Sequence, residues 1–130
     1  SACIDASGGL FDSLWLLHSL NPSLRIDIDM YSLPYADKIK ETADAVGFQP
    51  EAALVGGAGE YELLFTAPEN MDFLEIATHI GTVHKDSDPG LFINNNQRIT
   101  QPPPCPRDAG NIEEHTREVM LYARRLADGS

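Results

Sequence analysis

The chain has 130 residues, of which 42% are hydrophobic, and a formal net charge of −11. This length and hydrophobic content suffice for one domain with a single core, and they are too small for two independent domains. The acidic balance argues against a nucleic-acid interface, which needs clustered Lys and Arg, so an anionic ligand would require backbone N–H groups or Mg²⁺.

The sequence shows no sign of a membrane segment or of a disulfide framework. No stretch approaches the roughly 20 apolar residues that cross a bilayer, and no basic-then-apolar leader is present. Cys3 and Cys105 are too few for a disulfide scaffold and are expected to be reduced thiols. We therefore expect a cytoplasmic protein with no membrane partner. The chain begins inside a predicted strand, which we interpret as the mark of a fragment of a longer protein.

The first half of the chain alternates predicted strands and helices. Residues 2–4 form an apolar strand, and residues 10–20 carry apolar side chains at three-to-four spacing, which predicts a helix. Residues 24–30 alternate apolar and charged side chains, the pattern of a strand with one buried face. Residues 39–46 form a second amphipathic helix, which Gly47 is placed to end.

The second half continues this alternation. The apolar pattern predicts a buried strand over residues 62–66, a third helix over residues 71–80, and the start of another strand over residues 81–84. Residues 91–93 and 97–99 flank a run of asparagines, which predicts a hairpin.

A proline-rich connector and a helix follow the hairpin. Residues 101–110 contain a run of prolines that can neither continue a helix nor occupy a central strand. Asn111 and Glu114 are placed as the N-cap and capping-box pair of the helix, whose predicted core face carries Ile112, Val119, Met120, Ala123 and Leu126. The alternating elements predict an α/β or α+β sandwich.

The turn at residues 4–10 (IDASGGL) is the first candidate site. If its two glycines lead from strand into helix, free N–H groups and the positive end of the helix dipole would favour an anion. Ser7 could then hydrogen-bond a phosphate, and Asp5 could hold a bridging Mg²⁺. Alternatively, Ser7 is a helix cap and Asp5 a surface carboxylate. Spacing alone favours this ordinary turn.

Two further features could carry chemistry. Residues 56–65 (GGAGEYELLF) place a glycine-rich loop before a predicted strand, and this loop could present Glu60 and Tyr61 to a ligand. A mobile loop with solvated acidic side chains is the simpler interpretation of the spacing. Asp27 and Asp29 share one strand face, as a metal-binding pair would, but alternating charge is also typical of an exposed face, which we predict here.

Taken together, two segments resemble the thiamine-monophosphate kinases. Residues 4–10 are similar to that family's I-D-x-S-D-G-L turn, and residues 57–65 (GAGEYELLF) are similar to its G-G-E-D-Y-E-L-L-F. The strand RIDID with the following LP, and the IGTV strand start, fall in the family's order. The resemblance spans residues 2–95.

The resemblance implies that residues 1–130 are a single C-terminal domain related to that of aminoimidazole-ribonucleotide (AIR) synthetase. The implied fold is α+β, an α/β/α-layered sheet with partial ferredoxin-like topology. The implied activity is phosphoryl transfer from ATP to thiamine monophosphate, giving thiamine diphosphate. In that family an N-terminal half carries most of the Mg²⁺–ATP site and forms the homodimer, so the isolated segment is not expected to be active.

By motif position, the resemblance also implies site residues. Asp5 would hold metal or polyphosphate and Ser7 would touch the transferring phosphate, and these two are the implied catalytic residues. The implied substrate-binding residues are Gly8, Gly9, Gly57, Glu60 and Tyr61.

The sequence departs from the family pattern at two places. Gly8 stands where the family turn has its second Asp, and Ala58 and Gly59 replace Gly-Glu in the loop. Loss of an acidic Mg²⁺ ligand would weaken catalysis strongly. The Gly-Gly turn also resembles that of the AIR-synthetase and hydrogenase-maturation branches. Two alternatives therefore stand beside the kinase, namely another ATP-using enzyme of the superfamily and a member that has decayed into a binding or structural module.

Overall fold

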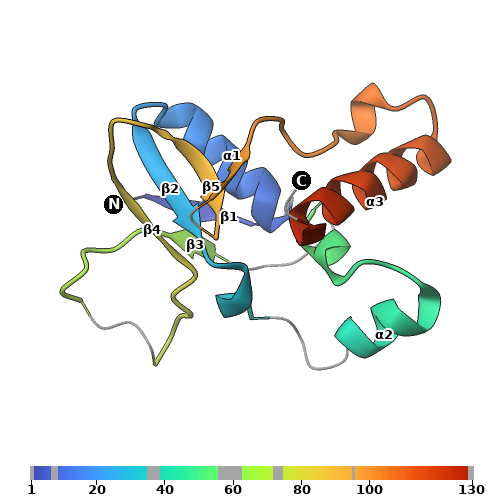
Figure 1. Cartoon of the computed structure of the whole chain (residues 1–130), viewed down its shortest axis with the longest axis horizontal. Helices are drawn as coiled ribbons and strands as arrows, with labels where there is room; N and C mark the ends of the chain where they lie inside the picture. The colour runs from blue at the N-terminus through green and yellow to red at the C-terminus, as the bar shows by residue number, and fades with distance from the viewer. Residues whose placement is uncertain are drawn as a thin grey trace.

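The computed structural model describes residues 2–6, 9–34, 39–55, 63–71, 75–94 and 96–128. Figure 1 shows strands β2, β4 and β5 together with α1, and helices α2 and α3 beside them. In chain order the elements are β1 (Cys3–Asp5), α1 (Leu10–Leu20), β2 (Leu24–Ile28), the 3₁₀ helix η1 (Met30–Ser32), α2 (Ile39–Val46), the 3₁₀ helix η2 (Pro50–Leu54), β3 (Leu63–Phe65), β4 (Gly81–Lys85), β5 (Gly90–Ile93), β6 (Gln97–Ile99), the 3₁₀ helix η3 (Pro106–Asp108) and α3 (Ile112–Asp128).

The strands form two sheets. The larger sheet has the order β4-β2-β5-β6, in which β2 is antiparallel to β4 and parallel to β5, and β5 and β6 form the predicted antiparallel hairpin. The smaller sheet is the antiparallel pair β1 and β3. Helices combined with mixed sheets give the α+β class that the sequence predicts.

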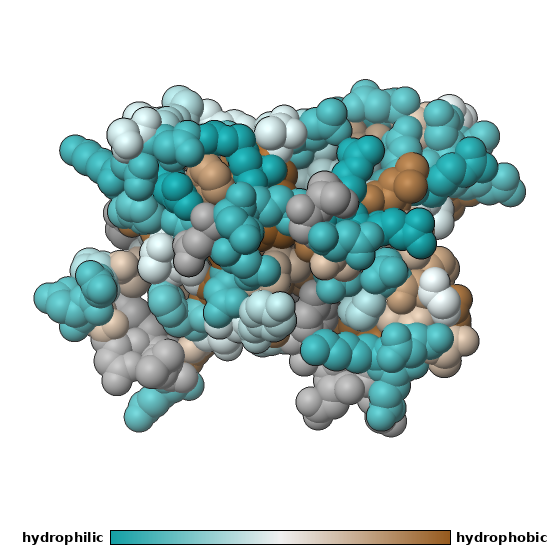
Figure 2. Space-filling view, in the orientation of Figure 1, coloured by the Kyte–Doolittle hydropathy of each residue, from teal (hydrophilic) through white to brown (hydrophobic). Residues whose placement is uncertain are grey.

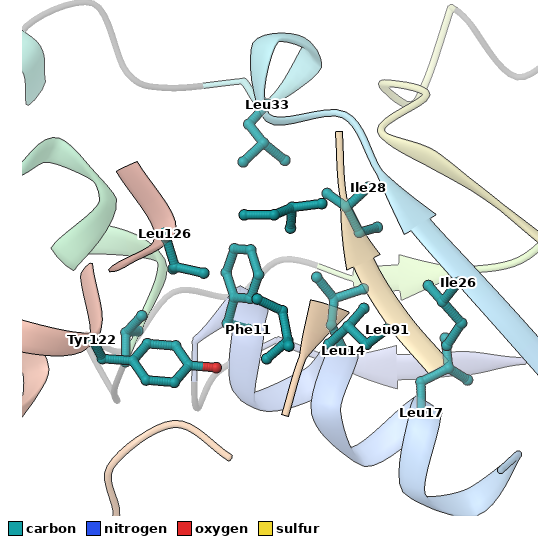
Figure 3. Close-up of a cluster of buried hydrophobic side chains, with 12 residues drawn as sticks. Phe11, Leu14, Leu17, Ile26, Ile28, Leu33, Leu91, Tyr122 and Leu126 are labelled. Atoms are coloured by element: carbon teal, nitrogen blue, oxygen red, sulfur yellow. The ribbon is translucent and has the colours of Figure 1, made fainter. Parts of the chain in front are cut away.

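Helix α1 and the larger sheet make the centre of the core. The apolar stripe of α1 places Phe11, Leu14 and Leu17 in one buried cluster with side chains of the sheet (Figure 3). Both Phe11 and Leu91 are completely buried. Burying a side chain of this size stabilises a fold by roughly 1.5–3 kcal/mol, so the burial of Phe11 holds the start of α1 against the core. The sheet residues of the cluster are Ile26, Ile28, Leu91, Ile93 and Ile99.

Helix α3 begins as the sequence predicts. The Glu114 backbone N–H donates to Asn111 Oδ1 at 2.8 Å, and the Glu114 carboxylate accepts from the Gly110 N–H at 2.7 Å. The predicted core face is wrong at Ile112, which is 81% exposed because the first turn of the helix extends past the core. Tyr122, Ala123 and Leu126 are buried, and the helix packs on η2.

Two local predictions are confirmed. Helix α2 ends at Gly47, whose φ of 75° lies in the left-handed region that favours glycine. Residues 102–105 form a connector without helix or strand structure, as the prolines predict. Asn94, in the hairpin turn, also has a positive φ, of 50°, which asparagine tolerates better than most residues.

The predicted helix over residues 71–80 is wrong for the part that the structure describes. Residues 75 and 76 form a turn, and residues 77–80 run without helical structure into β4. The backbone of Ile80 is used elsewhere, because its carbonyl accepts from the Asp29 N–H at 2.9 Å beside the end of β2. Ile76 is 80% exposed, so it adds nothing to an apolar helix face. Phe73, which belongs to the same predicted helix, lies outside the described residues.

The expectation that β3 is a buried strand is also wrong. Leu63 is 65% exposed and Phe65 is 37% exposed, whereas Leu64 packs against the core cluster. The reason is that β3 pairs with β1 alone in a two-stranded sheet, so only one of its faces turns toward the core.

The predicted exposed face of β2 is wrong at Asp27. Strand β2 lies between β4 and β5, and Asp27 is only 7% exposed. Its two carboxylate oxygens accept from the Arg25 guanidinium at 3.0–3.1 Å. That guanidinium lies 3.9 Å from the centre of the Phe92 ring, so a cation–π contact and an ion pair together cover this face of the sheet.

Two further observations concern the described residues. Both cysteines, Cys3 and Cys105, are free thiols at the surface. In the part of the chain that the structure describes, no helix is both long enough and apolar enough to span a bilayer.

Tyr122 joins α3 to the connector that precedes it. Its hydroxyl donates to the Gln101 carbonyl at 3.2 Å, and its ring is 7% exposed. Burial, and to a lesser extent the charge of Asp12 in the first turn of α1, raises the pKa of Tyr122 from 10.0 to about 12. The folded chain therefore holds this phenol protonated.

Replacing Tyr122 with Phe should flatten the alkaline loss of stability. Because the folded-state pKa lies above the unfolded value, this contribution to the free energy of unfolding is fully present below about pH 10 and is lost as the pH rises toward about 12. Urea unfolding across this range should show the decline in the native chain and a smaller one in Tyr122→Phe. Tyr31→Phe is the control, since Tyr31 is 92% exposed and should keep the native slope. A native slope in Tyr122→Phe would contradict the assignment.

Candidate functional site

The pairing of β1 with β3 brings the ends of the two motif segments together. The register places Cys3 opposite Phe65 and Asp5 opposite Leu63. Because the strands are antiparallel, the chain leaves β1 after Asp5 at the same end of the sheet at which it enters β3 at Leu63. The serine turn therefore starts where the glycine-rich loop ends, although the two lie far apart in the sequence.

Only part of the predicted site belongs to the described residues. Asp5 and Gly9 are described, and Asp5 is exposed at the end of β1. The other predicted site residues lie outside the described residues: Ser7, Gly8, Gly57, Glu60 and Tyr61.

The turn between β1 and α1 is tight and depends on glycine at its end. The Gly9 N–H donates to the Ala6 carbonyl at 2.9 Å, and both residues are buried. Gly9 has φ 106° and ψ 151°, a conformation that is essentially restricted to glycine. Gly9 is also the N-cap residue of α1, and Ser7, the cap in the ordinary-turn interpretation, lies outside the described residues.

Ser13, in the second turn of α1, holds this turn in place. Its buried hydroxyl lies 3.1 Å from the Gly9 carbonyl oxygen and 3.2 Å from the Asp5 carbonyl oxygen. One side chain therefore contacts the backbone on both sides of the turn. Sequence analysis missed this residue. The available signal was a lone hydroxyl on the otherwise apolar stripe of α1.

The start of α1 has the electrostatic character of an anion site. The first N–H groups of a helix lack intrahelical partners, and an N-cap glycine has no side chain to satisfy one of them. The aligned peptide dipoles add a partial positive charge at the same end. Asp12, in the first turn, adds a negative charge at this helix end, which favours a phosphate that is accompanied by a cation such as Mg²⁺. A phosphate group at this turn would meet backbone donors, and the missing Cβ of Gly9 allows a close approach.

Carboxylates elsewhere do not form a metal site in the part that the structure describes. Within these ranges no group of three or more His, Cys, Asp or Glu side chains could hold a metal ion. Asp27 binds Arg25, whereas the Asp29 carboxylate accepts from the Tyr31 N–H at 3.0 Å and from the Ser32 hydroxyl at 2.6 Å. These hydrogen bonds lower the pKa of Asp29, the Ser32 hydroxyl contributing most. Asp27 and Asp29 therefore bind different partners within the fold and do not act as a metal-binding pair.

Comparison with known proteins gives one informative match. No protein-family model and no curated protein sequence matches this chain. Among solved structures, the chain is similar to the crystal structure of thiamine monophosphate kinase from Aquifex aeolicus, with a TM-score of 0.62 and 26% sequence identity. The similarity covers 75% of this chain and 32% of that one, so this chain spans about a third of that kinase's length. The chain has the fold of a thiamine-monophosphate-kinase-like domain.

Proposed function

We propose that this chain is the C-terminal domain of an ATP-dependent thiamine-monophosphate-kinase-like enzyme. The observation that supports this most is the register that sets Asp5 opposite Leu63, in a fold similar to that of the kinase. The serine turn therefore leaves the small sheet at the same end at which the chain returns from the glycine-rich loop, and both segments resemble kinase motifs. The proposed reaction transfers the γ-phosphoryl group of ATP to the phosphate of thiamine monophosphate and gives thiamine diphosphate.

The two described site residues fit a Mg²⁺–phosphate group chemically. Asp5 supplies carboxylate oxygens, the ligand type that Mg²⁺ prefers, and it is exposed at the end of its strand. Gly9 and the start of α1 supply backbone donors for phosphate oxygens. Mg²⁺ would neutralise negative charge on the phosphates, and the transfer needs positioning rather than a protein nucleophile.

The remaining roles rest on sequence position. We assign Ser7 and Gly8 to the transferring phosphate, since both follow Asp5 in the turn. We assign Gly57, Glu60 and Tyr61 to the substrate, since they precede Leu63 in the chain. Most of the ATP site and the homodimer contacts are assigned to an N-terminal half of the full-length enzyme.

Asp5→Asn in the full-length enzyme tests this proposal. Loss of the carboxylate charge should lower kcat for thiamine diphosphate formation by on the order of 100-fold or more, because the site then holds Mg²⁺ poorly. Raising the Mg²⁺ concentration should recover part of the activity. The assay measures ADP release that depends on thiamine monophosphate.

Asp44→Asn is the matched control, because Asp44 is an exposed carboxylate on α2, away from the turn. It should keep the native kcat, and both variants should keep the native melting temperature. Native activity in a folded Asp5→Asn enzyme would overturn the role of Asp5. Calorimetry that detected neither thiamine monophosphate nor a Mg²⁺–ATP analogue binding to the folded full-length protein would overturn the proposal itself.

The glycine at position 8 favours a second candidate, a member whose phosphoryl-transfer turn has decayed. Gly8→Asp in the full-length protein restores the acidic side chain of the resembled family. If the turn has decayed, this change should raise thiamine-monophosphate kinase activity at least about tenfold. If the native protein is already fully active, the decayed-module candidate is wrong, and Gly8 is a functional variant of the turn. A third candidate, another ATP-using enzyme of the superfamily, requires ATP turnover with a different phosphate acceptor.

A further inference from the structure

A groove lies between α3 and the segment that follows α2, away from the proposed kinase turn. It has a volume of about 220 Å³. Figure 2 shows hydrophobic side chains over α3 and over the segment after α2, with hydrophilic side chains around them. The residues that line the groove are Gly47, Gln49, Arg117, Met120, Leu121 and Arg124.

The groove uses a stripe of α3 that the core does not use. Four of the lining residues follow the spacing i, i+3, i+4 and i+7, which places them on one face of the helix. The buried residues Tyr122, Ala123 and Leu126 occupy a different face. Leu121 is 50% exposed, and Phe48, which lies between two lining residues in sequence, is 49% exposed. The floor of the groove is therefore apolar and open to solvent.

Both ends of this apolar floor carry a guanidinium group. Arg117 and Arg124 are two helical turns apart, about 10 Å along the axis. Neither makes an ion pair or a hydrogen bond within the ranges that the structure describes. Arg25, Arg98 and Arg125, by contrast, bind Asp27, Asp88 and Gln101 respectively. Lys85 and Arg107 also lack such a partner within the described ranges, so what distinguishes Arg117 and Arg124 is their position at the two ends of one apolar strip.

We propose that this groove binds an acidic amphipathic helix of a partner protein. Its volume is below the roughly 300–1,000 Å³ of typical small-molecule pockets, and its open form suits side chains of a helix laid across it. Charge complementarity requires carboxylates two turns apart that flank apolar residues, the pattern Glu-x-x-Leu-Leu-x-x-Glu. An anionic membrane surface would face a broad part of a chain whose net charge is −11, whereas a single acidic helix needs to contact only the groove and its two arginines.

A synthetic helix-forming peptide with the pattern Glu-x-x-Leu-Leu-x-x-Glu tests the proposal. Fluorescence anisotropy of the labelled peptide, titrated with the full chain, should show saturable binding that weakens with salt. A peptide with Lys in place of both Glu, and one with Ser in place of both Leu, should each bind at least about tenfold more weakly, because each lacks one of the two complementary features.

Matched variants of the chain locate the binding. The double variant Arg117→Glu/Arg124→Glu should weaken peptide binding at least about tenfold. The control double variant Arg107→Glu/Arg125→Glu changes the net charge equally but lies outside the groove, and it should change the affinity less than about twofold.

Four outcomes would overturn the proposal. They are no saturable binding of the Glu peptide, equal binding of the Lys peptide, and equal loss of affinity in both double variants. The fourth is association of the chain with itself or with anionic vesicles that Arg117→Glu/Arg124→Glu abolishes, since the groove would then have a different occupant.

Discussion

The antiparallel pairing of β1 with β3 is the constraint on which the candidate site depends. At one end of the pair, the Thr66 N–H donates to the Ala2 carbonyl at 2.8 Å, and the Ala2 N–H donates to the Thr66 hydroxyl at 2.7 Å. These bonds fix the register that sets Asp5 opposite Leu63. A slip of one residue would turn every side chain of β3 to the other face. An isolated pair of strands is marginal in water, so the packing of Leu64 against the core is needed to hold the pair.

The core and the turn are linked through α1. Phe11 and Leu14 fix the helix against the larger sheet, and Ser13, between them in sequence, contacts the backbone on both sides of the turn. Gly9 supplies a conformation that a side chain would strain. The helix start is therefore held at the end of β1 by burial as well as by hydrogen bonds. Phosphoryl transfer depends on such positioning, because the protein supplies orientation and charge rather than a nucleophile.

Features that depend on neighbouring residues could be predicted from the sequence, and features that depend on distant partners could not. The stripe of α1 and the Asn111 cap of α3 follow from local spacing. The alternation of charged and apolar residues in β2 predicted that Asp27 is exposed. The sequence does not reveal that β2 lies between two strands, or that Arg25 stacks on Phe92 beside it. The exposure of β3 likewise depends on its single partner. For the site, the motif order indicated that the two segments belong together, whereas the strand register supplied the physical reason.

Disulfide trapping tests the register most directly. Because the Thr66 N–H donates to the Ala2 carbonyl, the next pair, Cys3 and Phe65, is a non-hydrogen-bonded pair with Cα atoms about 4.5 Å apart. In a Cys105→Ser background, Phe65→Cys should form a disulfide with the native Cys3 under mild oxidation. Leu64→Cys should not, because Leu64 lies opposite Ile4 and on the other face. Cross-linking of Leu64→Cys but not of Phe65→Cys would contradict the register, and with it the meeting of the two motif segments.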